Sequence, residues 1–280
     1  MSEARHPNDM DPSLGTPIRP KVYLLDVEGT VAPLTLTTEV LFPYARAHFE
    51  PFLRQSIAEF EMKGDDVEPR DIGEGTVLWD LAMLRLENRA DPDPEAPQIL
   101  PDSAAELGAV SMSPERGIPR ILKYIYWLMD RDRKSTALKS LQSKIWKAGF
   151  ESGELKGTLF DDVPEAFRKW SAEGRVAIYS SGSVEAQKLL FRHTIFGDLT
   201  SLISGYFDTR TGVKTAPGSY SAIAAAVEVM PGEAVFFSDA VKELDAAREA
   251  GCLTRLVVRP GNAPVDDGHG HAAVESLAGL

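Results

Sequence analysis

Acidic side chains follow a short apolar run near the start of the chain, in the order Asp26-Val27-Glu28-Gly29-Thr30. A third carboxylate, Asp239, follows another apolar run much later in the sequence. Carboxylates that share a cleft repel one another unless a divalent cation lies among them. Because oxygen ligands of this hard type favour Mg²⁺, the pattern indicates a magnesium-dependent site.

These groups suit phosphoryl transfer from a phosphate ester. Asp26 is the candidate nucleophile, which would attack phosphorus to form an aspartyl-phosphate. Glu28 is the candidate general acid for the leaving oxygen, and it would then help a water molecule to hydrolyse the intermediate. Ser181 and Gly182 open a predicted helix whose backbone N–H groups would seat a phosphate, and Lys214 would add a positive charge at the same oxygens.

The elements that carry these residues have the pattern of an α/β fold. Four short apolar runs end in polar residues, as strands buried on both faces do, and helical patterns lie between the later ones. Strands that alternate with helices predict a Rossmann-like, mostly parallel sheet, with the first strand central and beside the strand that ends at Asp239. The predicted strands are residues 22–25, 176–179, 234–237 and 255–258, and the predicted helices are 163–172, 183–191, 219–229 and 241–250.

A long insertion separates the first two strands. Apolar residues recur there at three- and four-residue intervals over 41–60, 76–88, 119–129 and 135–148, which predicts helices that pack on one another. Trp127, Met129 and Trp146 are assigned to its core, and residues 89–117 to a surface loop. We therefore expect a disordered tail over 1–20, a core domain of 21–32 and 158–280, and an inserted helical cap domain over 33–157.

Composition narrows the choice of partners and compartment. The formal net charge of −12 would repel a nucleic-acid backbone, so nucleic acid is not expected as a partner. The sequence has neither an apolar run long enough to span a bilayer nor a secretory signal, and its single cysteine, Cys252, is expected in the core. We expect a cytoplasmic monomer that acts on a small molecule.

Several sequence fragments together resemble known enzymes. LLDVEGT, YSSGSVEAQKLLF, FDTRTGVK and FSDAVKELDAA follow the order of the four motifs of the haloacid dehalogenase superfamily. LLDVEGT, LFPYAR, DRKSTALKSLQ, YSSGSVEAQKLLF and VVRPGNA resemble more closely the enolase-phosphatase family of methionine salvage. Glu28 stands where most phosphatases of the superfamily carry Asp, which favours this branch.

The resemblance implies an activity and the residues that perform it. The family enolises 2,3-diketo-5-methylthiopentyl-1-phosphate and then removes phosphate, which leaves the acireductone 1,2-dihydroxy-3-keto-5-methylthiopentene. It implies one Mg²⁺ held by Asp26, Glu28 and Asp239, with Glu28 supplying either its side chain or its carbonyl oxygen. Ser180, Ser181 and Lys214 would bind substrate, and Glu243 fits loosely the position of a further acidic residue near the metal.

Three alternatives stay open at this point. The first is another capped phosphatase or dehalogenase of the superfamily, which acts on a different small ester. The second is a signalling receiver domain, which also gathers Asp, Ser or Thr and Lys at strand ends, although the long insertion argues against it. The third is a binding protein that has lost catalysis, although every expected charged position is occupied.

Overall fold

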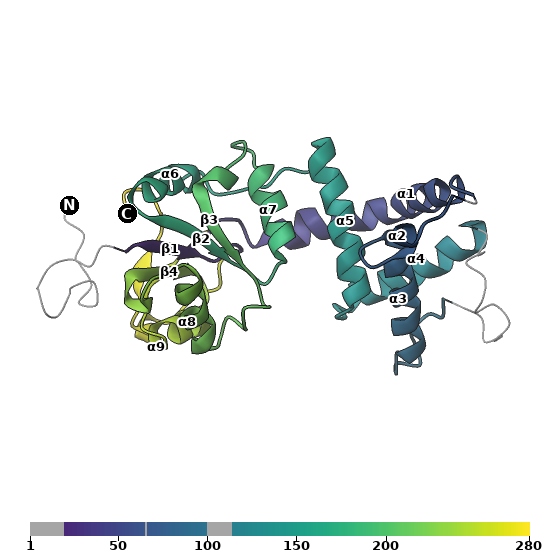
Figure 1. The fold of residues 1–280 in the computed structure, drawn as a ribbon. Helices are drawn as coiled ribbons and strands as arrows, with labels where there is room; N and C mark the ends of the chain where they lie inside the picture. The colour runs from purple at the N-terminus through teal and green to yellow at the C-terminus, as the bar shows by residue number, and fades with distance from the viewer. Residues whose placement is uncertain (1–19, 65, 100–113) are drawn as a thin grey trace, which may run out of the picture. The chain divides into compact units, whose positions relative to one another are not determined.

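The computed structural model describes residues 20–64, 66–99 and 114–280. The chain divides into two compact units, of which one combines the described part of 1–38 with 150–280 and the other spans 39–149 (Figure 1). The predicted tail over 1–20 lies almost wholly outside the described residues, as do residues 100–113 of the predicted loop over 89–117.

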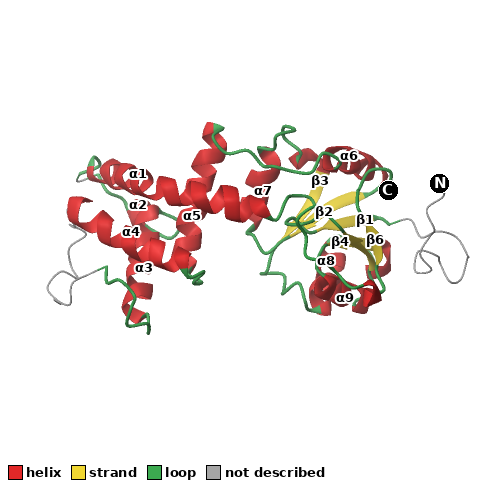
Figure 2. Cartoon of the chain, turned by 180° about the vertical axis from the view of Figure 1, so that it is seen from behind, coloured by secondary structure: helices red, strands yellow, loops and turns green. Residues whose placement is uncertain are grey.

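The first unit contains a parallel sheet of six strands in the order β3-β2-β1-β4-β5-β6 (Figure 2). The α/β class, the central place of β1 and its pairing with β4 are confirmed. The strands are β1 (Val22–Leu25), β2 (Arg175–Tyr179), β3 (Ile203–Phe207), β4 (Ala234–Ser238), β5 (Leu253–Val257) and β6 (Ala272–Val274).

The two edge strands, β3 and β6, are absent from the sequence prediction. Their side chains are mostly half-buried or exposed, whereas all residues of β1 and β4 are buried. An edge strand has only one strand neighbour and need not be an unbroken apolar run, so the pattern that revealed the central strands does not reveal these.

Helices cover both faces of the sheet (Figure 1). Leu24 and Phe236 on one face belong to a buried cluster with side chains of α8 and α9. Tyr23 and Phe237 on the other face stack on Trp170 of α6, at centroid distances of 4.7 and 5.1 Å. The helices of this unit are α6 (Val163–Glu173), α7 (Val184–Arg192), α8 (Pro217–Ala226) and α9 (Val241–Glu249), close to their predicted ranges.

The second unit is helical and has a hydrophobic core of its own. That core includes Trp127, and Met129 and Trp146 pack against it, as predicted. Helices α3 and α4 extend into the predicted loop over 89–117, so its ends are helical rather than irregular. The helices here are α1 (Phe42–Glu61), α2 (Pro69–Ile72), α3 (Val77–Ala90), α4 (Pro114–Asp130) and α5 (Thr136–Ser152), and a π-helix (Leu36–Leu41) precedes α1.

A buried ion pair secures the loop that follows β1. The guanidinium of Arg259 donates to both carboxylate oxygens of Asp162, at 2.8 and 2.9 Å, and to the carbonyl of Thr30 at 3.1 Å. Asp162 also accepts from Ser276 Oγ and from the amide of Leu277. Burial acts to raise the pKa of Asp162, but these donors outweigh burial and lower it.

We expect Asp162→Asn to lower the free energy of unfolding by about 3–5 kcal/mol, because it leaves Arg259 buried without its counter-ion. The control Glu50→Gln breaks an exposed pair with Arg54 and should cost less than about 1 kcal/mol.

The stability of the fold should also depend on pH, because the pKa of Asp162 is lowered in the folded state. The stabilisation that Asp162 gives to the folded state is present above the carboxyl's unfolded pKa of about 3.9 and is lost as the pH falls through its folded pKa. Denaturant unfolding at neutral and acidic pH measures both effects, and equal losses for the two variants at neutral pH would contradict the assignment.

Candidate active site

Asp26 lies directly after β1, at the carboxyl end of the central strand. Leu25 pairs with Phe237 of β4, and the amide of Asp26 donates to the carbonyl of Phe237 at 2.9 Å. Ligands bind beyond the carboxyl ends of parallel strands, where the helix N-termini also point. Asp26 is 7% exposed, so its carboxylate is almost fully removed from bulk water.

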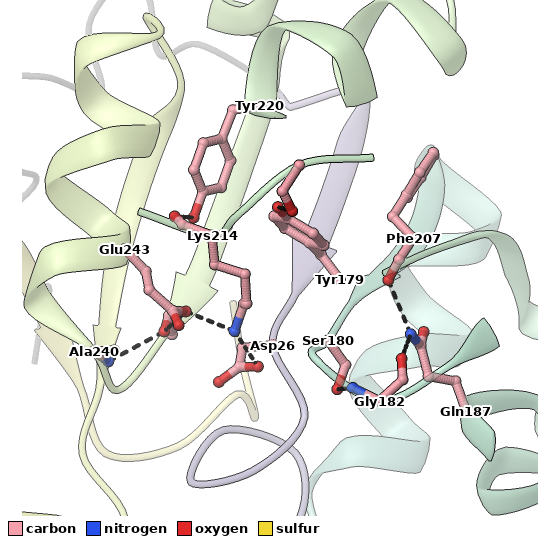
Figure 3. Close-up of polar contacts among 12 residues, drawn as sticks. Asp26, Tyr179, Ser180, Gly182, Gln187, Phe207, Lys214, Tyr220, Ala240 and Glu243 are labelled. Carbon is pink, nitrogen blue, oxygen red and sulfur yellow. Dashed lines mark hydrogen bonds and ion pairs between the residues drawn. The ribbon is translucent and has the colours of Figure 1, made fainter. Parts of the chain in front are cut away.

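Lys214 neutralises part of the charge at this position (Figure 3). Its ammonium lies 2.5 Å from Asp26 Oδ1 and 2.6 Å from Glu243 Oε2. The carbonyl of Lys214 accepts from the hydroxyl of Tyr220 at 2.7 Å, which fixes the backbone from which the side chain extends. Sequence reasoning predicted Lys214 in the site, and the structure brings it into direct contact with the candidate nucleophile.

Burial and the neighbouring opposite charge have opposing effects on the pKa values of both Asp26 and Lys214. Burial raises the pKa of Asp26 to about 7, while the ammonium of Lys214 acts to lower it and Glu243 adds to the rise. Burial also acts to lower the pKa of Lys214, but Asp26 and Glu243 outweigh it and raise that pKa, so the lysine stays protonated at neutral pH. The lysine charge thus offsets part of the cost of ionising Asp26 in a buried place.

Glu243 contacts Lys214 directly, although the sequence suggested only a loose relation to the metal. Ser238 Oγ donates to Glu243 Oε2 at 3.0 Å and accepts from the amide of Ala240 at 3.1 Å. Ser238 ends β4 and Glu243 lies in the first turn of α9, so the strand-to-helix turn holds the carboxylate in position. In the sequence, Glu243 was noted only for its position a few residues after Asp239, where the resemblance implies a further acidic residue.

Asp239 packs against the backbone of Gly29. Gly29 has φ +73°, and a Cβ at this position would lie 2.3 Å from Asp239 Oδ2, so only glycine allows this approach. Burial raises the pKa of Asp239, and the nearby carboxylates of Glu243 and Glu28 add to that rise. Glu28 itself is half-buried, and its carboxylate accepts a hydrogen bond from the hydroxyl of Thr37.

The donor set fits a hard divalent cation. The carboxylates of Asp26, Asp239 and Glu243 lie near the ammonium of Lys214, and that of Glu28 lies near Asp239, so an ionised site carries excess negative charge. Within the described residues, no three acidic, histidine or cysteine side chains converge on a common metal position. A metal at this point therefore requires a main-chain oxygen beside the carboxylates, for which the carbonyl of Glu28 is the candidate, and such an all-oxygen set suits Mg²⁺.

The turn after β2 differs from the predicted phosphate seat. Ser180 Oγ accepts from the amide of Gly182 at 3.1 Å, so this N–H already has a partner (Figure 3). Helix α7 is capped by Ser183, whose Oγ accepts from the amide of Ala186, and not by Ser180 or Ser181. Ser181 is exposed.

An acidic residue stands at the start of the same helix. Asp208 Oδ2 accepts from the amide of Val184 at 3.3 Å, and Arg210 forms an ion pair with Asp208. Part of the anion-binding capacity of this helix end is thus used within the protein. A phosphate held by Ser180 and Ser181 would have to bind beside these contacts.

Comparisons with known proteins agree with the motifs. Residues 20–251 match the family of haloacid dehalogenase-like hydrolases. Enolase-phosphatase E1 of Synechococcus elongatus is 46% identical over 90% of this chain and 94% of its own length. Enolase-phosphatase E1 of Drosophila mojavensis is 38% identical over 91% of each chain.

A solved structure extends the likeness to three dimensions. The UTR4 protein of Saccharomyces cerevisiae is 31% identical and aligns with a TM-score of 0.67 over 94% of this chain and all of that one. Sequence, motif order and fold lead to the same conclusion: this chain belongs to the haloacid dehalogenase-like hydrolases and, among them, to the enolase-phosphatase family.

Proposed function

We propose that this protein converts 2,3-diketo-5-methylthiopentyl-1-phosphate to the acireductone 1,2-dihydroxy-3-keto-5-methylthiopentene and phosphate in methionine salvage. The observation that carries the proposal is the buried carboxylate of Asp26, which ends a central strand and lies 2.5 Å from the ammonium of Lys214. Phosphoryl transfer needs an anionic nucleophile and a nearby fixed positive charge, and these two residues supply both. The similarity to enolase-phosphatases supports the substrate.

The dephosphorylation uses groups of this chain in sequence. A carboxylate oxygen of Asp26 attacks phosphorus while the ester P–O bond breaks, and the departing enediol oxygen takes a proton from the Glu28 carboxyl. The Glu28 carboxylate then accepts a proton from a water molecule that attacks the aspartyl-phosphate, which releases phosphate and restores Asp26. The Thr37 hydroxyl holds the Glu28 side chain during both steps.

The enolisation precedes this transfer and needs different groups. A base removes a proton from the carbon beside a substrate carbonyl, and an electrophile stabilises the enolate oxygen. Bound Mg²⁺ supplies electrostatic stabilisation to substrate oxygens in both reactions. Asp26, Asp239 and the carbonyl of Glu28 are the oxygens proposed to hold it, with Ser180, Ser181 and Lys214 proposed to bind the phosphate.

The helical unit is proposed to be the cap domain of this enzyme, with the core and cap boundaries predicted from the sequence. No helix of the described residues is long and apolar enough to cross a membrane. A cytoplasmic location, a monomeric state and the absence of a nucleic-acid partner remain predictions from composition and charge.

A two-signal assay separates this function from its alternatives. The diketone phosphate is supplied to the purified protein, and enol absorbance and free phosphate are followed together. We expect the enol to rise and phosphate to follow. Phosphate release from other small esters but not from this substrate would favour another phosphatase of the superfamily, and a long-lived phosphorylated protein without turnover would favour a receiver.

We expect removal of Mg²⁺ to stop turnover, because several carboxylates then face an anionic substrate without a counter-ion. The measurement is phosphate release in excess chelator, with restoration by added Mg²⁺. Asp239→Asn should raise the Mg²⁺ concentration required or abolish activity, since one anionic oxygen of the proposed ligand set is lost. Full activity in excess chelator would overturn the metal assignment.

Lys214→Ala should slow phosphate release by about 10²–10³-fold, which corresponds to about 2–4 kcal/mol of transition-state stabilisation. The reason is that the ammonium both keeps Asp26 ionised and faces the phosphoryl oxygens. Lys188→Ala is the matched control, because Lys188 is an exposed lysine of α7, and it should change the rate less than about threefold. An equally small effect for Lys214→Ala would make Lys214 an ordinary loop lysine.

Asp26→Asn should abolish phosphate release, because the amide keeps the size of the side chain but lacks the charge for attack on phosphorus. Enolisation does not require this nucleophile, so we expect slow growth of enol absorbance to survive at high Mg²⁺. Both signals are measured over a Mg²⁺ titration. Phosphate release at the wild-type rate would refute the nucleophile assignment.

A further inference from the structure

The segment Arg259-Pro260-Gly261-Asn262 follows β5, and the proposed reaction assigns it no task. Its two polar side chains reach back to the loop that follows the nucleophile. Asn262 Nδ2 donates to the carbonyl of Gly29 at 2.9 Å, and Arg259 Nε donates to the carbonyl of Thr30 at 3.1 Å. Two consecutive carbonyls of the loop are therefore held by side chains from one distant segment.

The orientation of the Asn262 amide follows from its partners. Its NH₂ group also donates to the carbonyl of Val257 at 3.2 Å. A carbonyl oxygen can only accept, so both contacts require the NH₂ group on that side and direct Oδ1 the other way. This Oδ1 is buried and has no hydrogen-bond partner among the described residues. The side-chain hydrogen bonds of Asn262 are thus made by its NH₂ group.

Oδ1 of Asn262 faces the same loop residue as the carboxylate of Asp239. A Cβ built on Gly29 would lie 3.1 Å from Asn262 Oδ1 and 2.3 Å from Asp239 Oδ2. The amide oxygen and the carboxylate oxygen thus flank one small region beside the Gly29 backbone. The residue that Asn262 holds is thus the same residue against which the proposed metal ligand Asp239 packs.

We propose that Asn262 is a positioning residue for the metal site. Its NH₂ group holds the Gly29 carbonyl and thereby the loop from Asp26 to Thr30, which carries two of the proposed metal ligands, the carboxylate of Asp26 and the carbonyl of Glu28. This inference rests on the proposed magnesium-dependent function. Asn262 is proposed to act on the ion through the loop that carries these ligands.

Asn88 shows what a purely structural asparagine looks like in this chain. Its Nδ2 donates to the carbonyl of Pro97 at 2.8 Å, and its Oδ1 accepts from the amide of Ile99 at 2.9 Å. Both ends of that amide are satisfied by backbone groups, whereas only the donor end of Asn262 is. Asn88 also belongs to the helical unit, which carries none of the proposed metal ligands.

The test compares Asn262→Ala with Asn88→Ala in the full-length protein. Thermal unfolding is followed over a titration with Mg²⁺ alone, since an ion that binds the folded state raises the melting temperature as its concentration passes the dissociation constant. We expect Asn262→Ala to weaken the apparent Mg²⁺ affinity by about 10–100-fold, as for loss of other outer-shell partners. Asn88→Ala should lower the melting temperature but keep the Mg²⁺ affinity within about threefold.

Other results of this titration would contradict either the role of Asn262 or the proposed metal site itself. A Mg²⁺ affinity for Asn262→Ala within about threefold of wild type would overturn the role of Asn262 while leaving the metal site intact. No Mg²⁺-dependent shift in the wild-type protein would instead remove the proposed metal and this inference with it. If Asn262→Ala does not fold, Asn262→Ser carries the same test, because it also removes both the amide oxygen and the NH₂ group.

Discussion

The in-register pairing of β1 with β4 is the constraint on which the site depends. Because Leu25 lies beside Phe237, the chain leaves both strands at the same edge, and Asp26 stands next to the turn that carries Ser238 and Asp239. A slip of one residue would turn every side chain of β1 to the opposite face of the sheet and displace Asp26 from its place beside Phe237. The two faces of β1 pack on different partners, so the core fixes the register that the chemistry requires.

The cost of burying Asp26 explains the groups around it. An isolated buried carboxylate would take up a proton, and the ammonium of Lys214 opposes this effect of burial. That ammonium is in turn held by Glu243, and Glu243 by Ser238 at the end of β4. The contacts from Asp26 through Lys214 and Glu243 to Ser238 thus connect the end of β1 to the end of β4. The excess negative charge of this cluster is the reason why we expect a divalent cation to bind there.

The sequence was most informative where function depends on position along a strand. Asp26 and Asp239 were predictable because apolar runs end directly before them, and central strands are the easiest to recognise. Contacts that depend on the reach of a side chain, such as those of Glu243 and Asn262, leave no comparable pattern. The sequence pattern did not predict the edge strands β3 and β6, because exposed residues in these strands interrupt the apolar runs. Ser180 was identified, but its bond to the Gly182 amide depends on a turn geometry that residue types alone do not fix.

The loop after Asp26 links the stability of the sheet unit to its chemistry. Arg259 binds the carbonyl of Thr30 with one nitrogen and Asp162 with the others, and Asp162 also receives the amide of Leu277 near the end of the chain. The nucleophile loop is thus held to the start of α6 and to the C-terminal segment through one desolvated ion pair. A buried pair contributes little net stability compared with an apolar replacement, but its geometry is strict. The Arg259–Asp162 pair fixes the position of the Thr30 carbonyl. This position in turn limits how far Gly29 and Asp26 can move from the edge of the sheet.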